Sequence, residues 1–85
     1  MEKYNGYANF ETWCVMLWID NSQAVYNYFI NIAREKETHE TMDILKEYFE
    51  ENSPLINEAS LYADLLNGAL SVVNWHEIAT LLKEK

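Results

Sequence analysis

The sequence predicts an all-α fold, a compact bundle of about five short helices in a single domain over residues 1–85. The chain contains only two glycines and one proline, too few for a many-turned β-protein. Hydrophobic residues make up 49% of it and charged residues 24%, the composition of a globular domain. Apolar residues recur at helical spacing between repeated helix-start signals. A chain of this length can bury one small core, so we expect no second domain.

The first helix is predicted within residues 5–21, which read NGYANFETWCVMLWIDN. Asn9 is a favoured N-cap residue, and the helix ends with the apolar run 13–19. Because this run is apolar all round, we expect the helix to be the central, buried one, with Trp13 and Trp18 in the core. A short buried strand is the alternative, since seven residues alone do not fix the periodicity.

Amphipathic patterns predict the next two helices. Over 21–36 the apolar residues follow the i, i+3, i+4, i+7 spacing of one helix face: Val25, Tyr28, Phe29 and Ile32. Thr38 is the predicted cap of a helix over 39–52, which Ser53 and Pro54 end. The side chains expected to face inward from this helix are Met42, Leu45 and Phe49.

The last two helices are predicted over 57–72 and 75–84. The fourth has two adjacent apolar rows: Leu61, Leu65, Ala69 and Val72, and beside them Leu66, Leu70 and Val73. Gly68 costs up to ~1 kcal/mol inside a helix, so we expect it to allow a close contact with another helix. Residues 74–77, Asn-Trp-His-Glu, form a capping box that starts the fifth helix, with Val73 and Ile78 as its hydrophobic staple.

The sequence contains no recognisable catalytic or metal-binding constellation. Cys14 is the only cysteine, so no intramolecular disulfide or thiolate cluster can form, and its apolar surroundings predict a buried, unreactive thiol. His39 and His76 lack metal-ligand spacing, and we expect them to face solvent or to make local hydrogen bonds. Asn5-Gly6 is a turn signal and not a phosphate-binding loop. We therefore expect a protein that is not an enzyme and that uses no cofactor or metal.

Charge and targeting signals limit the expected partners. With 14 acidic and 6 basic residues the net charge is −8, so direct binding to nucleic acid is disfavoured and a basic protein is the natural complement. The N-terminal residues lack the charged and apolar regions of a signal peptide. The longest apolar run is far shorter than the ~20 residues that a membrane span needs. We therefore predict a cytoplasmic protein that binds neither nucleic acid nor membrane.

The most informative polar feature is an acidic row in the third predicted helix. Spacings of three, four and three residues place four carboxylates on one helix face: Glu40, Asp43, Glu47 and Glu50. The field is extended by Glu35, Glu37 and Glu51. Like charges at this spacing repel by a few tenths of a kcal/mol per pair, so local stability does not favour the row. It is either a solvated face that keeps the protein soluble or an anionic binding surface.

Aromatic residues offer a second possible contact surface. Those at helical spacing are expected in the core, by preference Trp13, Trp18, Phe29 and Phe49. Tyr4 and Tyr7 flank the Asn-Gly turn, and either pack as a lid over the bundle or form exposed contacts, since tyrosine is favoured at binding surfaces. Together with Trp75 they are the alternative partner-binding residues.

Two stretches resemble the signature segments of a known family: residues 5–21, quoted above, and SLYADLLNGALSVVNWHEIA at residues 60–79. That family consists of small acidic proteins, and C-terminal domains, carried by tailed phages, prophages and other mobile elements, and it has no assigned activity. The resemblance implies that the protein is encoded among accessory proteins of mobile elements, which often counter host defence. The matching residues are interpreted as fold-defining: Asn9, Glu11 and Thr12 as caps of the first helix, Trp13, Leu17 and Trp18 as core, and Asn74 and Glu77 as caps of the last.

These observations lead to two hypotheses. The first is an inhibitor of a host nucleic-acid-targeting defence complex, anti-CRISPR or anti-restriction, whose acidic surface binds a basic nucleic-acid groove stoichiometrically. The CRISPR effector is the favoured target, and in that case the protein acts in the cytoplasm of the host cell. The second is a non-catalytic adaptor or regulator that binds another protein through the aromatic residues. Charge reversal in the acidic row distinguishes the two, because only the inhibitor depends on it.

Overall fold

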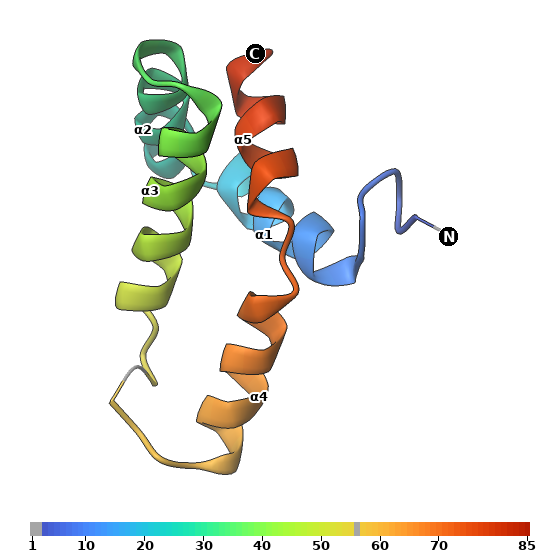
Figure 1. The fold of residues 1–85 in the computed structure, drawn as a ribbon, viewed down its shortest axis with the longest axis vertical. Helices are drawn as coiled ribbons and strands as arrows, with labels where there is room; N and C mark the ends of the chain where they lie inside the picture. Colours follow the sequence, from blue (N-terminus) through green and yellow to red (C-terminus); the bar gives the residue numbers. More distant parts are fainter. Residues whose placement is uncertain (1–2, 56) are drawn as a thin grey trace.

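The computed structural model describes residues 3–55 and 57–85 and confirms the all-α architecture (Figure 1). Its helices are α1 (Phe10–Asn21), α2 (Gln23–Glu35), α3 (Thr38–Glu51), α4 (Leu61–Ser71) and α5 (Trp75–Lys83). Thr38 is the first residue of α3 and not its cap, which is Glu37. The fourth helix begins later than predicted because its N-cap is Ser60, whose hydroxyl accepts a hydrogen bond from the Ala63 amide.

The central helix is α5, and the prediction that α1 is central is wrong. Helix α5 packs against α1, α2 and α3, and it buries Trp75, Ile78, Ala79 and Leu82. Helix α1 buries only Thr12, Met16 and Ile19. Its Leu17 is exposed, its Trp13 is half-buried, and its Trp18 is 67% exposed. A helix that is apolar all round does not indicate which of its faces the rest of the chain covers.

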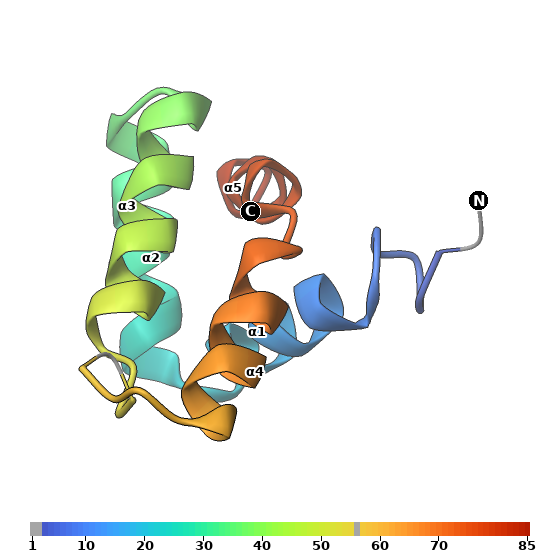
Figure 2. The ribbon, with the colours of Figure 1, turned by 60° about the horizontal axis from the view of Figure 1, so that its bottom comes forward.

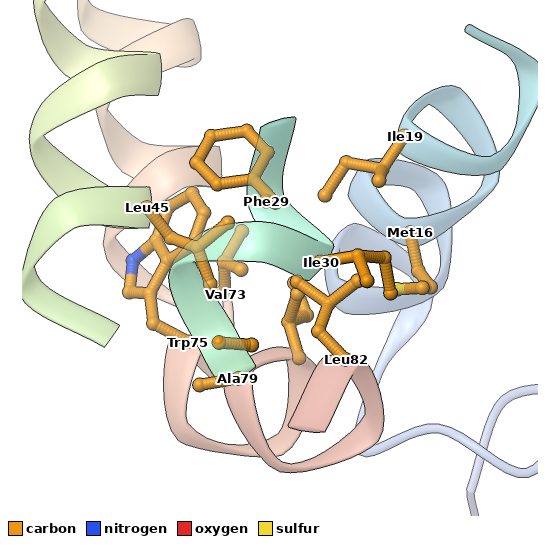
Figure 3. Close-up of a cluster of buried hydrophobic side chains, with 11 residues drawn as sticks. Met16, Ile19, Phe29, Ile30, Leu45, Val73, Trp75, Ala79 and Leu82 are labelled. Atoms are coloured by element: carbon orange, nitrogen blue, oxygen red, sulfur yellow. The ribbon is translucent and has the colours of Figure 1, made fainter. Parts of the chain in front are cut away.

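The core lies between α5 and the three helices around it (Figure 3). Phe29 of α2 and Leu45 of α3 are fully buried, as predicted from their spacing. Phe49 packs against this core and stacks on Trp75, with ring centroids 5.8 Å apart. Val73 and Ile78 are both buried in the cluster, as expected for the staple before and after the start of α5.

The Asn-Gly turn closes a short N-terminal hairpin. Asn5 and Gly6 both have positive φ, as the two central residues of a type I′ turn do. Tyr4 and Tyr7 flank the turn and exchange two backbone hydrogen bonds of 2.8 Å. The Tyr4 ring then packs against Phe10 and Trp13 of α1, with centroid distances of 5.4 and 5.1 Å.

Hydrogen bonds join the two segments on which the family resemblance rests, and Thr12 is at their centre. The Asn9 carboxamide oxygen caps α1 by accepting from the Thr12 amide at 2.9 Å and from its hydroxyl at 2.6 Å. The Thr12 hydroxyl oxygen in turn accepts from the Asn74 amide at 2.8 Å. The Asn9 amide group also donates to the Val72 carbonyl oxygen at 2.7 Å. The start of α1 is thereby fixed to the chain between α4 and α5.

The predicted capping box of α5 is shared with the N-terminal segment. Asn74 accepts from the Glu77 amide at 3.0 Å, as in a capping box. The Glu77 carboxylate, however, accepts from the Ala8 amide at 3.0 Å, and the Asn74 amide donates to Thr12 instead. One half of the box is therefore a tertiary contact that closes a ring of hydrogen bonds through residues 8, 9, 12, 74 and 77.

Helix α4 projects from the bundle and makes few contacts with the other helices (Figure 1). The radius of gyration is 13.0 Å, slightly more than the ~12 Å of a compact domain of this length. The row of Leu66, Leu70 and Val73 is at least half-buried, whereas Leu61, Leu65 and Val72 are exposed. The expected close contact at Gly68 is absent, since a Cβ built there meets no atom within 4 Å.

A candidate surface for a basic partner

Helix α3 carries the predicted acidic row on its exposed side. Its five acidic side chains beyond the N-cap are all exposed: Glu40, Asp43, Glu47, Glu50 and Glu51. Glu35 ends α2 and Glu37 precedes α3, and both are exposed as well. The helical rise places successive members of the row roughly 4.5–6 Å apart along the axis.

The seven carboxylates do not form one uninterrupted cluster. Near the start of α3, the Glu40 carboxylate accepts a hydrogen bond from the Glu37 amide at 3.2 Å, so it has a local role in capping the helix. Lys83 reaches the same turn and donates to the Lys36 carbonyl oxygen at 2.9 Å, which brings cations to this end of the row. The strongest excess of negative charge therefore lies at the other end, around Glu47 and Glu51.

The C-terminal end of α3 is an unfavourable place for carboxylates. The helix dipole is negative there, and the last turn contains Glu50 and Glu51 and no basic residue. An acidic side chain at this position loses typically about 0.3–1 kcal/mol relative to a basic one. Repulsion between neighbouring carboxylates adds to that cost. The stability of α3 therefore does not explain its C-terminal acidic residues.

A shallow aromatic pocket lies beside these carboxylates. It has a volume of about 180 Å³ and lies between α2 and α3, lined by Tyr28, Ile44, Glu47, Tyr48, Glu51 and Asn52. Tyr28 is 52% exposed, and its ring centroid is 6.1 Å from that of Tyr48. Aromatic faces attract cations, and a carboxylate pair adds charge-assisted hydrogen bonds. The pocket has the chemistry to hold a lysine or arginine side chain.

Sequence reasoning missed this pocket because it assigned Tyr28 to the inward face of α2. The available signal was residue type: a tyrosine at the edge of an apolar face usually keeps its hydroxyl in water. On the opposite flank of α3, Glu50 and Lys46 line a separate cavity of about 290 Å³, whose far wall is Asn67 and Ser71 of α4. Glu50 therefore shares its cavity with a cation, Lys46, whereas the aromatic pocket of Glu47 and Glu51 is lined by no basic residue.

The alternative aromatic set does not form a surface. Trp75 is only 7% exposed and stacks on Phe49, so little of its side chain is accessible to a partner. Tyr7 is half-buried against the core, as expected for a lid. Tyr4 is exposed, although one side of its ring covers Phe10 and Trp13.

The other candidate reactive groups are far less organised. His39 and His76 are exposed, as predicted. Cys14 is half-buried and not fully buried as expected, and it lines a pocket between α1 and α4, whereas His76 lines a different pocket beside Lys3. Among residues 3–55 and 57–85, no group of three His, Cys, Asp or Glu side chains is arranged to hold a metal ion.

In a comparison with protein families, one family model matches the whole of residues 1–85. The matching model is that of a family of unknown function, DUF7249. The chain belongs to this family. Comparison of the DUF7249 chain with curated proteins and with solved structures gives no match. In the described part of this DUF7249 chain, no helix has the length and apolar character needed to cross a bilayer.

Proposed function

We propose that this protein is a non-catalytic accessory protein of a phage or mobile element that inhibits a host nucleic-acid-targeting defence complex. It binds a basic nucleic-acid groove stoichiometrically through the exposed acidic side of α3, in a CRISPR effector in preference to a restriction enzyme. The observation that carries the proposal is the pocket in which Glu47 and Glu51 lie beside Tyr28 and Tyr48. The mobile-element resemblance supports the choice of target.

The chemistry of such a groove matches this surface. Lysines and arginines that neutralise phosphates also pair with carboxylates. The axial spacing of the carboxylate row is of the same order as the ~3.4 Å rise per phosphate of one DNA strand. The Tyr28–Tyr48 pocket adds a stacking site for one arginine, which bare solvated carboxylates do not offer. A net charge of −8 increases the rate of encounter with a basic partner, most strongly at low salt.

Affinity capture with matched variants tests the proposal. The wild-type protein and the variant Glu47→Lys/Glu51→Lys are used as baits in lysates of a CRISPR-bearing host, at low and moderate salt. The control is Asp20→Lys/Asp64→Lys, which changes the net charge equally at exposed positions of α1 and α4. We expect wild type and control to recover a nucleic-acid-binding complex and the α3 variant to lose it.

A captured complex is then purified and assayed for binding to its target nucleic acid. Wild-type protein should abolish target binding at about one copy per complex, and the α3 variant should not. Failure to recover any nucleic-acid-binding complex at either salt contradicts the proposal. Equal recovery by both charge-reversed variants would show that net charge alone, and not the surface of α3, is responsible.

The adaptor hypothesis ranks second because its proposed residues do not lie together at the surface. With Trp75 buried, only Tyr4 and part of Tyr7 remain to contact a partner. An adaptor of that kind would retain its partner in the Glu47→Lys/Glu51→Lys variant and would lose it in Tyr4→Ala. The same capture experiment therefore decides between the two functions.

A further inference from the structure

Helices α1 and α4 meet at an apolar corner on a different part of the molecule from the acidic side of α3. Between them is a pocket of about 170 Å³, to which α1 contributes Phe10, Cys14 and Val15 and α4 contributes Leu66 and Ala69. Val73, which follows α4, also lines the pocket. Glu11 is the single charged residue among the lining residues. We call this pocket and the two helix faces that extend from it the α1–α4 corner.

Both helix faces continue outward from the pocket as exposed apolar side chains. On α1, Trp18 follows Cys14 by one helical turn, so the two share a face, and Trp18 is 67% exposed. On α4, Tyr62 and Leu65 precede Leu66 and Ala69 by one turn, and they are 71% and 63% exposed. Projecting apolar side chains thus flank an apolar pocket.

The corner gathers most of the exposed apolar surface of the protein. Among the residues that the structure describes, nine large hydrophobic side chains are exposed, and six of them belong to α1 and α4. They are Phe10, Leu17, Trp18, Leu61, Tyr62 and Leu65. Three of the six are aromatic, a class of side chain that buries roughly 150–250 Å² in full, and the six are between 37% and 71% exposed, so together they still offer several hundred Å². That is the scale of the ~800 Å² that each partner buries in a standard interface.

The two helices of the corner also carry few charges. Helices α1 and α4 contain three charged side chains, Glu11, Asp20 and Asp64, and no lysine or arginine. The acidic residues of the candidate surface for a basic partner lie on α2, on α3 and between the two. Figure 2 shows these two helices on the opposite side of α4 and α5 from the start of α1. Two negatively charged copies could therefore meet at the corner with little direct repulsion.

We propose that the α1–α4 corner binds the same corner of a second copy of this chain in a two-fold symmetric dimer. A two-fold interface uses one patch twice, so that patch must carry both the projections and the hollow that receives them. The corner has both: Trp18 and Tyr62 project, and the pocket between α1 and α4 receives a large apolar side chain. The dimer leaves both acidic α3 surfaces accessible, and the inference does not depend on the function proposed for them.

Sedimentation velocity over a concentration series tests the dimer. The wild-type protein should pass from a 10.0 kDa monomer to twice that mass as concentration rises. Trp18→Glu and Leu65→Glu should each raise the dissociation constant by about tenfold or more, because each places a charge in the apolar contact. Tyr28→Glu is the control: it adds the same charge at an exposed aromatic on α2 and should leave the constant unchanged.

Tryptophan fluorescence provides a second measurement that does not rely on a destabilising variant. If Trp18 enters the interface, its emission should shift to shorter wavelength as the dimer forms, and Trp18→Phe should remove most of that shift. A wild-type protein that stays monomeric throughout the series overturns the inference. So does a dimer that persists in both Trp18→Glu and Leu65→Glu, or one that only Tyr28→Glu disrupts.

Discussion

Thr12 shows how much one polar side chain contributes to the position of a helix. It is fully buried, and its hydroxyl both donates to Asn9 and accepts from the Asn74 amide. Buried polar groups are stabilising only when each has a partner. In this protein the partners come from opposite ends of the chain, so the ring that they close determines where α1 begins relative to α5.

We predict that Thr12→Val lowers the free energy of unfolding by about 1–3 kcal/mol, because the Asn74 amide and the Asn9 carboxamide both lose a hydrogen-bond partner. Chemical denaturation monitored by circular dichroism measures the change. Thr12→Ser keeps the hydroxyl, so its free energy of unfolding should fall by clearly less than that of Thr12→Val. Thr80→Val is a useful reference, since the Thr80 hydroxyl donates only to the His76 carbonyl within α5. Equal losses for Thr12→Val and Thr80→Val would argue against a role for the ring.

The three tryptophans are predicted to differ sharply in their contribution to stability. Trp75→Ala should cost ~3–5 kcal/mol, since Trp75 is buried and stacks on Phe49. Trp18→Ala should change the stability of the monomer by no more than about 0.5 kcal/mol, because its side chain is mostly exposed. Trp13, half-buried beneath Tyr4, should fall between them. Urea denaturation at concentrations below dimer formation tests this order, which a large loss in Trp18→Ala would contradict.

At the scale of single elements, four of the five helices have a clear local signal for their start. Side-chain oxygens of Asn9, Ser22, Ser60 and Asn74 each accept a hydrogen bond from a backbone amide three residues later. These bonds span so few residues that they form wherever the helix lies in the molecule. This is why the number and order of the helices were predictable.

Gly68 provides a test of how loosely α4 is packed. Its position is exposed, and a Cβ there would meet no neighbouring atom within 4 Å. Gly68→Ala should therefore raise the free energy of unfolding by about 0.5–1 kcal/mol, because alanine favours the helix and loses less conformational entropy. Thermal and urea denaturation measure the gain. Destabilisation by Gly68→Ala would instead indicate the close helix contact expected from the sequence.

At the scale of the whole molecule, the charge distribution is strongly asymmetric. The net charge is −8, and the acidic side chains of α3 are exposed on one helix, whereas α1 and α4 contain few charges. Exposed like charges repel one another across distances shorter than the Debye length, about 30 Å at 0.01 M salt and 8 Å at 0.15 M. The folded state should therefore gain more from salt than the expanded unfolded chain does.

We predict that the melting temperature rises by a few degrees between 0.01 M and 0.15 M salt. Differential scanning calorimetry measures it. The variant Glu47→Gln/Glu50→Gln/Glu51→Gln should melt higher at low salt and respond less to added salt, because three mutually repelling charges are gone. A melting temperature of the wild type that does not change with salt would mean that these carboxylates already have cationic partners.

The sequence by itself determined the number and order of the helices, the caps of α1 and α5, and the set of exposed carboxylates on α3. These features depend on contacts between residues three or four positions apart, which the order of residues specifies directly. The same reasoning placed Leu45 and Phe29 in the core, because each belongs to a single apolar face that has only one way to be buried.

Only the tertiary structure decided which side of an apolar helix is covered. Every face of α1 is apolar, so its sequence does not indicate which face is buried. Met16 and Ile19 are buried because other helices pack against them, and Trp18 is left exposed. Likewise the partner of the Glu77 carboxylate is Ala8, sixty-nine residues away, and no spacing rule reaches that far. The pocket of Tyr28 and Tyr48 exists because α2 and α3 lie side by side. Long-range packing selects among faces that are locally equivalent, so the candidate site was predictable in its carboxylates and not in its aromatic wall.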